Sequence, residues 1–428
     1  MKRLHTIVLP HYKLTEDRKT EQIKLPELVH LPMLMHRGTP AKPIVVPGEE
    51  VTVGQKVGAA EAEDAVPVHA SVSGKVIAVT DYTTLYGETV PCVAIVPDGK
   101  QTRFPQIAPP EIPTREDFVK AVQESGCVGL SGSGHPTHLK LKTEKNIDML
   151  IINGIECEPY LTADCRRMVE EPAAVLGGIQ YILRMLKIKQ ARLAIADDKP
   201  AAVKIFADAC RSIPEITVVP LKTAYPQGAE KVLVYHVCGR VIPENAAADD
   251  VGVIVLNVST VAFLYRYIRT GMPLTEAVVT VEGDAVRNPG SLRVPIGTPM
   301  RNLLAHCGCA FDKIGELIAG GVMMGVKVPS PDLPVTKLQN GLLAFRKERY
   351  WEATACIRCG NCMRACPMGL MPMELERAYE KFNWKKLSKL HASLCTGCGC
   401  CTYVCPAKRP LAAQLQYAKL MLEEGGLN

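Results

Sequence analysis

The sequence predicts a multidomain α/β protein with a β-rich N-terminal module and a small, helical, cysteine-rich C-terminal domain. Three observations support this prediction. Short apolar runs separated by glycine begin near residue 44, strand and helix patterns alternate between residues 116 and 269, and nine of the seventeen cysteines fall within residues 356–405. A chain of 428 residues is long enough for three or four domains, each with its own hydrophobic core.

The composition indicates a globular protein and argues against several other classes. Hydrophobic residues make up 47% of the chain and charged residues 22%, which is typical of folded domains. The longest apolar stretch, residues 251–265, is interrupted by polar side chains, and the first ten residues lack the apolar core of a signal peptide. The net charge of +6 is mild and shows no basic cluster, so we expect no nucleic-acid partner. Seventeen cysteines fit a reducing cytoplasm.

The first hundred residues are expected to contain an extension and a β module. Residues 1–35 are predicted to be an irregular N-terminal extension, because prolines interrupt them repeatedly. Residues 36–100 contain short valine-rich runs separated by glycine turns, which predict a compact β module. This pattern resembles the barrel-sandwich domains that carry lipoyl or biotinyl groups. No modifiable lysine is evident at the predicted hairpin tip, so we expect a scaffold role.

An α/β domain is predicted for residues 101–275, and its alternating pattern begins beyond a proline-rich linker that covers residues 98–118. Strand and helix patterns alternate there, which indicates a parallel sheet with crossover helices. The predicted strands are 149–153, 191–196, 216–220 and 251–256, and the predicted helices are 116–125, 171–185, 201–211, 228–238 and 259–269. Ligands of such sheets bind beyond the carboxyl ends of the strands, where helix starts expose backbone N–H groups.

Residues 276–345 are predicted to form a small α+β domain. Strand-like residues at 278–294 surround an Asn288-Pro289-Gly290 turn, a helix is expected at 300–305, and residues 318–325 are rich in glycine. Glycine at these positions indicates close approach of backbone segments, because it has no side chain to keep them apart.

Two cysteine quartets organise residues 346–428. Each quartet has the spacing Cys-x2-Cys-x2-Cys-x3-Cys followed by proline, which is the bacterial-ferredoxin pattern for two [4Fe–4S] clusters. In this pattern the fourth cysteine of each quartet binds the cluster of the other. The expected ligand sets are Cys356, Cys359, Cys362 and Cys405 for one cluster, and Cys395, Cys398, Cys401 and Cys366 for the other.

Other interpretations of these cysteines fit less well. A structural zinc site would show cysteine pairs, and a disulfide framework belongs to small secreted chains. Cys400 precedes Cys401 directly and could compete with it as a ligand, but the triplet spacing favours Cys401. Helices are predicted at 373–381 and after Pro410, so this domain is a helical ferredoxin with long connections.

Two segments of the α/β domain are candidates for binding a ligand. Gly129, Gly132 and Gly134 lie in a loop that is followed by Lys140, and such a loop can cradle a phosphate with backbone N–H groups and a cation. The second segment follows a predicted buried strand and presents Asn153, Glu156 and Glu158, again at the edge where a ligand would lie.

The chain resembles the C subunit of the Rnf-type ferredoxin:NAD⁺ oxidoreductase complex, and its α/β and following domains are similar to the flavin-bearing subunit of respiratory complex I. The resemblance runs from about His36 to the second cysteine quartet. It is carried by the blocks 67–76, 136–141, 153–164, 225–230, 257–260, 295–299 and 320–325, and by the paired quartets in the same order.

The resemblance implies a Rossmann-like domain that binds FMN noncovalently, with the glycine loop and Lys140 near the phosphate. Its implied contacts are Asn153, Glu156 and Glu158 at the flavin ring or ribityl chain, Tyr225, Gly228 and Glu230 on the side of NAD(H), and Asn257 and Thr260 at the flavin. It also implies a soluble-ligand-binding β-grasp (SLBB) domain at 276–345. A flavin accepts a hydride as two electrons and releases them singly, which suits transfer to clusters.

The resemblance further implies a peripheral subunit on the cytoplasmic face of a membrane complex that moves ions. Membrane subunits and an iron–sulfur subunit would be its partners, and ferredoxin would be reached indirectly. The chain departs from the family in the glycine loop, where Ser131 replaces glycine, Ser133 replaces alanine or threonine, and His135 replaces phenylalanine.

Three alternatives follow from these departures and from the shared architecture. One is a variant member of the family with little or no NADH binding that serves another carrier, such as a cytochrome or a quinone-like acceptor. Another is a cobalamin reductase of the microcompartment type, although residues 160–164 favour the Rnf family. The third is a cofactor-free scaffold around a cluster relay. The visible spectrum would discriminate among them.

Overall fold

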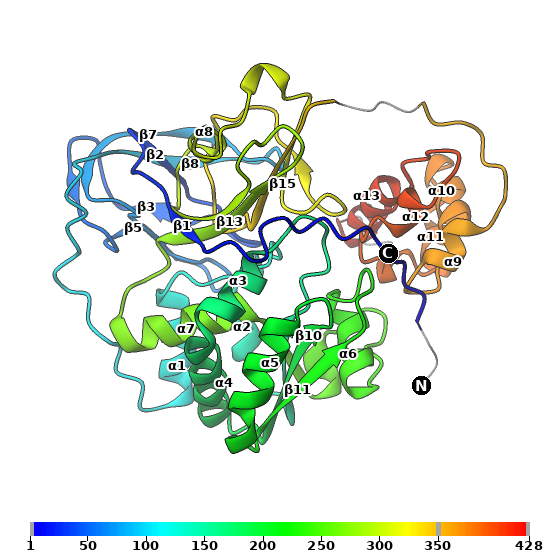
Figure 1. Cartoon of the computed structure of the whole chain (residues 1–428), viewed down its shortest axis with the longest axis horizontal. Helices are drawn as coiled ribbons and strands as arrows, with labels where there is room; N and C mark the ends of the chain where they lie inside the picture. Colours follow the sequence, from blue (N-terminus) through cyan, green and yellow to red (C-terminus); the bar gives the residue numbers. More distant parts are fainter. Residues whose placement is uncertain (1–3, 348–351, 425–428) are drawn as a thin grey trace.

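The computed structural model describes residues 4–347 and 352–424, and small parts of the predicted ranges 1–35 and 346–428 therefore lie outside the described residues. Figure 1 shows the N-terminal β module and the following β-rich domain above the α/β domain, with the helical C-terminal domain to one side. None of the helices in the described ranges has the length and apolar character needed to cross a bilayer.

The N-terminal module consists of two antiparallel sheets with the strand orders β2-β8-β7-β4 and β3-β5-β6. Its strands are β2 (Val29–Pro32), β3 (Lys42–Pro43), β4 (Glu50–Val51), β5 (Lys56–Ala59), β6 (Val68–His69), β7 (Gly74–Thr83) and β8 (Thr89–Pro97). In β7, Val76 is buried between the exposed Lys75 and Ile77, as expected of a strand with one face in a core. The predicted β module is thus present.

The N-terminal segment is not irregular throughout, contrary to the sequence prediction. Ile7 forms an antiparallel bridge with Tyr225, β1 (Glu21–Gln22) pairs with β14 (Gly290–Pro295), and β2 pairs with β8. Figure 1 shows this segment, in dark blue, passing between the upper β-rich part and the α/β domain. Its strands are two to four residues long and have distant partners, so no local periodicity predicts them.

The α/β domain contains a four-stranded parallel sheet with the order β11-β10-β9-β12. Its strands are β9 (Met149–Gly154), β10 (Gln190–Ala196), β11 (Ile216–Leu221) and β12 (Val253–Asn257). Its helices are α1 (Arg115–Glu124), α2 (Thr137–Leu141), α3 (Ala163–Glu170), α4 (Pro172–Leu186), α5 (Pro200–Ala209), α6 (Glu230–Cys238) and α7 (Val258–Thr270), with 3-10 turns η1 (Cys210–Ser212) and η2 (Ala248–Val251). Strands β10 and β11 lie on one side of β9, and β12 lies on the other side. The strand order therefore reverses between β9 and β12, and parallel sheets bind ligands at such a point.

Helix α3 was not predicted, although α1, α4, α5, α6 and α7 lie within a few residues of the predicted helices. Its buried face carries Arg166 and Arg167, which make its sequence appear polar. Each arginine forms an ion pair four residues along the chain, with Glu170 and Glu171 respectively. Glu171 also binds Arg266 of α7 and Arg293 of β14, so long-range charge pairing explains why this helix can be buried.

The following domain contains a six-stranded sheet with the order β1-β14-β13-β17-β15-β16, in which β1 comes from the N-terminal segment. Its other elements are β13 (Glu276–Glu282), α8 (Met300–His306), η3 (Phe311–Lys313), β15 (Glu316–Ala319), β16 (Val326–Lys327) and β17 (Gly341–Phe345). Val279, Leu292 and Leu303 are fully or almost fully buried and belong to one core that joins α8 to the sheet.

The surroundings of Glu282 on β13 lead us to expect that the free energy of unfolding depends on pH. Its side chain is buried, and neither carboxylate oxygen has a hydrogen-bond partner of good geometry. Burial raises its pKa to about 7, while the nearby Leu14 N–H and Lys13 charge act in the opposite direction. The folded protein therefore holds a proton that the unfolded chain loses near pH 4.5, and the free energy of unfolding should fall as pH rises from about 4.5 to 7.

Glu282→Gln should remove the part of this fall that Glu282 causes, which amounts to about 3 kcal/mol for a shift of this size. The measurement is urea unfolding of the unaltered and variant chains at pH 5 and pH 8. Glu276→Gln, at the exposed end of the same strand, is the matched control. An equal loss of stability between the two pH values in all three chains would contradict the assignment to Glu282.

The C-terminal domain is helical, as predicted. It contains α9 (Asn361–Ala365), α10 (Pro372–Glu380), α11 (Trp384–Lys389), η4 (Ala392–Leu394), α12 (Cys400–Tyr403) and α13 (Leu411–Glu424). Helices α10 and α13 are the two predicted helices, and Leu411, Leu415 and Ala418 of α13 are buried. Arg409 donates from Nε to both oxygens of the buried Glu376 at 2.8 Å, and this pair fixes α10 against the start of α13.

Candidate functional site

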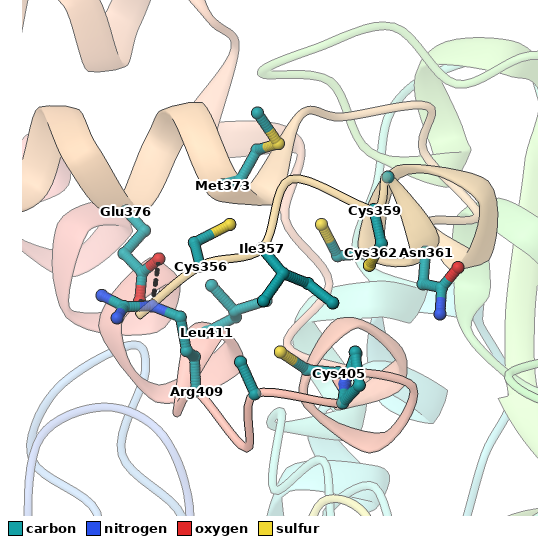
Figure 2. A pocket seen from close by; sticks show the side chains of 13 residues that line it. Cys356, Ile357, Cys359, Asn361, Cys362, Met373, Glu376, Cys405, Arg409 and Leu411 are labelled. Carbon is teal, nitrogen blue, oxygen red and sulfur yellow. Dashed lines mark hydrogen bonds and ion pairs between the residues drawn. The ribbon is translucent and has the colours of Figure 1, made fainter. Parts of the chain in front are cut away.

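Two cavities in the C-terminal domain are each lined by cysteines from both quartets. The first is lined by Cys356, Cys359, Cys362 and Cys405, together with Met373 and Leu411. Figure 2 shows these four cysteines around one shared space. The second is lined by Cys366, Cys395, Cys398 and Cys401, and by Cys400. The structure thus brings together the two crossed sets that the ferredoxin pattern predicts.

The two quartets have the same local backbone geometry. In each quartet, the second residue after the first cysteine has a positive φ, which is 58° at Arg358 and 67° at Gly397. The residue that directly follows the second cysteine also has a positive φ, which is 76° at Gly360 and 79° at Gly399. The third cysteine then lies on a short helix, α9 or α12. Left-handed residues in such a turn direct successive N–H groups toward a common centre, which suits an anionic cluster with thiolate ligands.

The thiols are held in surroundings that oppose ionisation until a cation is bound. Burial raises the pKa of Cys362, of Cys395 and of Cys401, and it raises that of Cys366 to about 11. Cys398 differs, because a hydrogen bond with Cys400 lowers its pKa to about 6. Thiolates are the form that binds metal, and the positive charge of iron favours that form.

Cys400 remains a neighbour of the second ligand set. It is fully buried and lines the same cavity as Cys401. Across the described ranges, no group of three or more histidine, cysteine, aspartate and glutamate side chains is arranged to hold a single metal ion.

In the α/β domain, the predicted cofactor residues gather at the carboxyl ends of β9 and β12. Lys140 donates to the carbonyl of Val255 at 3.3 Å and to Glu230 at 2.6 Å. The remaining contacts link the other predicted residues: Asn153 Nδ2 donates to the Gly228 carbonyl at 3.0 Å, Asn257 Nδ2 to the Asn153 carbonyl at 3.5 Å, and the Leu130 N–H of the glycine loop to Thr260 Oγ1 at 3.1 Å. These residues meet where the strand order reverses.

The glycine loop offers donors that suit a phosphate. Gly132 and Gly134 have φ values of 90° and 63°, which glycine adopts without strain. In the described part of the chain, the N–H groups of Ser131, Gly132 and Ser133 donate to no protein acceptor. Three consecutive free N–H groups beside the start of α7 and near a lysine match the donor set that a flavin phosphate requires.

Two of the family departures have visible consequences in this loop. The Ser133 hydroxyl lies against Gly129, at the place where a side chain on Gly129 would begin. The His135 ring donates from Nδ1 to the carbonyl of Pro136 at 3.0 Å, and it is partly buried. Burial lowers the pKa of His135, so the ring is neutral near pH 7.

Glu156 caps a helix. Its carboxylate accepts from the N–H groups of Asp164 and Cys165 at 2.7 and 3.1 Å, at the start of α3. Anionic side chains are stable at this end of a helix because the N–H groups there lack partners within the helix. The structure therefore gives Glu156 a role in fixing the loop after β9, whether or not a flavin lies beside it.

Asp164 is a site residue that the sequence interpretation missed. It is buried and accepts from Asn257 Nδ2 at 2.6 Å and from Ser259 Oγ at 2.5 Å. Burial and the charge of Glu156 raise its pKa to about 6. It holds Asn257 in place at the start of α7. Within the sequence, Asp164 appears only as an acidic residue in the block 153–164. Its role could not be seen there, because its partners lie more than ninety residues away.

Glu158 and Tyr225 face the C-terminal domain. The Tyr225 hydroxyl donates to the backbone carbonyl of Cys398 at 2.7 Å and lies 3.4 Å from Glu158 Oε1. Glu158 Oε2 accepts from the Met323 N–H at 3.0 Å. Burial raises the pKa of Glu158 to about 7 and also raises that of Tyr225. These two residues connect the α/β domain to the second cavity.

Four family models match successive parts of the chain. Residues 4–100 match the RnfC barrel sandwich hybrid domain, residues 122–266 the Nuo51 FMN-binding domain, residues 278–327 the SLBB domain, and residues 355–408 the 4Fe–4S dicluster domain. This order confirms the predicted fold class, including a domain of the FMN-binding type and a domain of the two-cluster type.

Curated relatives cover most of the chain. The C subunit of the Na⁺-translocating ferredoxin:NAD⁺ oxidoreductase complex of Acetobacterium woodii is 39% identical, over 92% of this chain and 91% of the relative. The C subunit of the ion-translocating oxidoreductase complex of Rhodobacter capsulatus is 38% identical, over 97% and 82%. The C subunit of the proton-translocating ferredoxin:NAD⁺ oxidoreductase complex of Clostridium ljungdahlii is 36% identical, over 85% and 81%. The chain therefore belongs to the family of C subunits of Rnf-type ion-translocating oxidoreductase complexes.

Proposed function

We propose that this chain transfers electrons between a bound FMN and two [4Fe–4S] clusters as one subunit of an ion-translocating ferredoxin:NAD⁺ oxidoreductase complex. The observation that carries the proposal is the presence, in one chain, of two cavities lined by crossed cysteine quartets and a domain of the Nuo51 FMN-binding type. A flavin supplies the chemistry that converts a two-electron exchange into single electrons for clusters.

The residues present fit FMN at the carboxyl ends of β9 and β12. The free N–H groups of the glycine loop and the ammonium group of Lys140 would hold the phosphate. The amides of Asn153 and Asn257 would bind the polar part of the flavin, with Asp164 and Thr260 fixing the loop and helix on either side. A bound phosphate would compete with Glu230 for Lys140, so Glu230 would be released toward the dinucleotide side.

The proposed ligands are Cys356, Cys359, Cys362 and Cys405 for the first cluster, and Cys366, Cys395, Cys398 and Cys401 for the second. The matched backbone of the two quartets supports Cys401 over Cys400, because Cys362 occupies the equivalent position on α9.

We propose the division of the chain that the sequence predicts, at residues 35, 100, 275 and 345, with β2 joining the N-terminal extension to the barrel-sandwich sheet. By analogy with the family, the partners would be membrane subunits that move the ion and an iron–sulfur subunit, with ferredoxin reached through them. This assembly would place the chain at the cytoplasmic face of the membrane.

The test is the visible spectrum and metal content of the anaerobically purified chain. We expect FMN bands above a broad iron–sulfur shoulder, with about eight iron atoms and about eight acid-labile sulfides per chain. The shoulder without flavin bands would support the cofactor-free scaffold around a cluster relay. Far fewer than eight iron atoms would contradict the proposal as a whole.

A second candidate is the variant family member that binds NADH poorly. The Ser133 hydroxyl packed against Gly129 favours it, because it fills space beside a backbone that a cofactor must approach. Mixing NADH with the flavin-loaded chain decides between the candidates. Bleaching of the flavin bands supports an NADH-linked chain, and unchanged bands support a chain that serves another carrier.

A further inference from the structure

One apolar cluster joins four parts of the chain beside the second cavity. It contains Tyr225 of the α/β domain and Cys398 and Cys400 of the C-terminal domain, and Met323 and Ile7 pack against it. Met323 belongs to the loop between β15 and β16, and Ile7 to the N-terminal segment. Figure 1 shows this loop, in yellow, and the dark-blue N-terminal segment reaching the side of the C-terminal domain.

The first cavity lies apart from this junction. Both cavities are lined by C-terminal residues only, but the cluster of buried side chains around Cys362 and Leu411 is made of C-terminal residues alone, whereas the cluster around Cys398 includes Tyr225. Cys359 is exposed, and the adjacent Ile357 is 66% exposed. The two cavities therefore differ: the second one contacts the α/β domain, and the first one is open to the surroundings.

Tyr225 makes a buried polar contact across this junction. Only 2% of its surface is exposed, and its hydroxyl donates to the carbonyl oxygen of Cys398 at 2.7 Å. Cys398 is the middle cysteine of the second quartet's closely spaced triplet. The surroundings of a cluster's ligands tune its potential, and the Tyr225 O–H dipole, whose positive end points at the Cys398 carbonyl, favours the reduced, more negative form of a cluster beside it. The same bond fixes the distance between the cluster and the flavin-type domain.

Glu158 holds Tyr225 in this position from the other side. Its carboxylate lies 3.4 Å from the Tyr225 hydroxyl and accepts from the Met323 N–H. Gly321, two residues before Met323, leaves no room for a side chain, because a Cβ there would overlap the Glu158 carboxyl group. The loop after β15 therefore fits closely around Glu158.

We propose that Tyr225 is a positioning residue that fixes the second quartet against the α/β domain, so that the cluster on Cys366, Cys395, Cys398 and Cys401 exchanges electrons with the flavin before the other cluster does. This inference rests on the proposed function and extends it to the order of transfer. Each electron that leaves the reduced flavin converts one [4Fe–4S]²⁺ cluster to [4Fe–4S]⁺. The two electrons of one flavin thus reduce both clusters, the second quartet first and the exposed first quartet by onward transfer.

Tyr225→Phe tests the proposal, because it keeps the buried ring and removes only the hydroxyl. The bound FMN is photoreduced under anaerobic conditions with light and EDTA, and cluster reduction is followed by absorption and electron paramagnetic resonance. We expect unchanged FMN and iron content, cluster reduction slowed at least tenfold, and a lower midpoint potential for one cluster only. Tyr417→Phe, which removes a hydroxyl from an exposed tyrosine of α13, is the control and should change none of these.

Two further variants sharpen the result. In a Cys405→Ser background, only the second cluster should remain, and Tyr225→Phe should still lower its midpoint potential. A midpoint potential that Tyr225→Phe no longer shifts in this background would overturn the proposal. Gly321→Ala, which displaces Glu158, should also slow cluster reduction. Normal rates and potentials in Tyr225→Phe with both cofactors present would also overturn it and leave the proposed function intact. An unaltered chain without FMN or clusters would instead defeat the proposed function.

Discussion

Replacing Cys405 with serine is expected to remove one whole cluster and lower the iron content from about eight to about four atoms per chain. The reason is that Cys405 lines the first cavity, although it belongs to the second quartet in sequence. Cys366→Ser should remove the other cluster to the same extent, because Cys366 lines the second cavity. Iron and acid-labile sulfide analysis after anaerobic purification measures both effects.

Double variants distinguish crossed from uncrossed ligands. With crossed ligands, Cys359→Ser combined with Cys405→Ser damages one cluster twice and should leave about four iron atoms, whereas Cys359→Ser combined with Cys366→Ser should leave almost none. Uncrossed ligands would reverse these two results. Cys307→Ser, a buried cysteine far from both cavities in the sequence, is the control and should keep the full iron content.

Cys400→Ser completes this series. If Cys401 is the ligand, the variant keeps the full iron content but loses the hydrogen bond that Cys400 makes with Cys398. A loss of half the iron would instead identify Cys400 as the ligand.

Replacing Lys140 with methionine is expected to weaken FMN binding about 10- to 100-fold. A hydrogen bond to a charged group contributes about 1.5–3 kcal/mol, and about 1.4 kcal/mol corresponds to a factor of ten in affinity. Methionine keeps much of the aliphatic length of lysine and removes the ammonium group. The measurement is the quenching of flavin fluorescence when FMN is added to the flavin-free chain.

Lys142→Met is the matched control for Lys140→Met. Lys142 lies one residue beyond α2, is exposed, and pairs with Glu63 of the N-terminal module. Its loss should leave the FMN dissociation constant unchanged. Equal affinities in the two variants would contradict a role for Lys140 at the phosphate.

The cysteine sites could be predicted from the sequence because ligand spacing is a local property. The positions of Cys356, Cys359 and Cys362 within seven residues already determine a loop followed by a helical turn, and the structure has that geometry. The central strand β9 and its neighbour β12 were equally evident, because both of their faces are buried and they appear as continuous apolar runs.

The roles of the polar residues at the domain junction could not be predicted in the same way. The sequence predicts Tyr225 on the dinucleotide side and Glu158 at the flavin, and the structure adds contacts of their side chains with Cys398 and Met323, which are more than 160 residues away. Asp164 was missed for a similar reason, because its role depends on Asn257. Such contacts exist only after domains pack together, and no periodicity or spacing within one segment encodes them.

The path of the N-terminal segment has a consequence for how the molecule is assembled. Arg18 donates to the carbonyl of Pro289, a contact that spans 271 residues, and β1 pairs with β14. During synthesis these early residues leave the ribosome long before their partners exist. They therefore remain unpaired until the later strands have been synthesised and have folded. A fluorescent probe placed on them would report the last step of folding rather than the first.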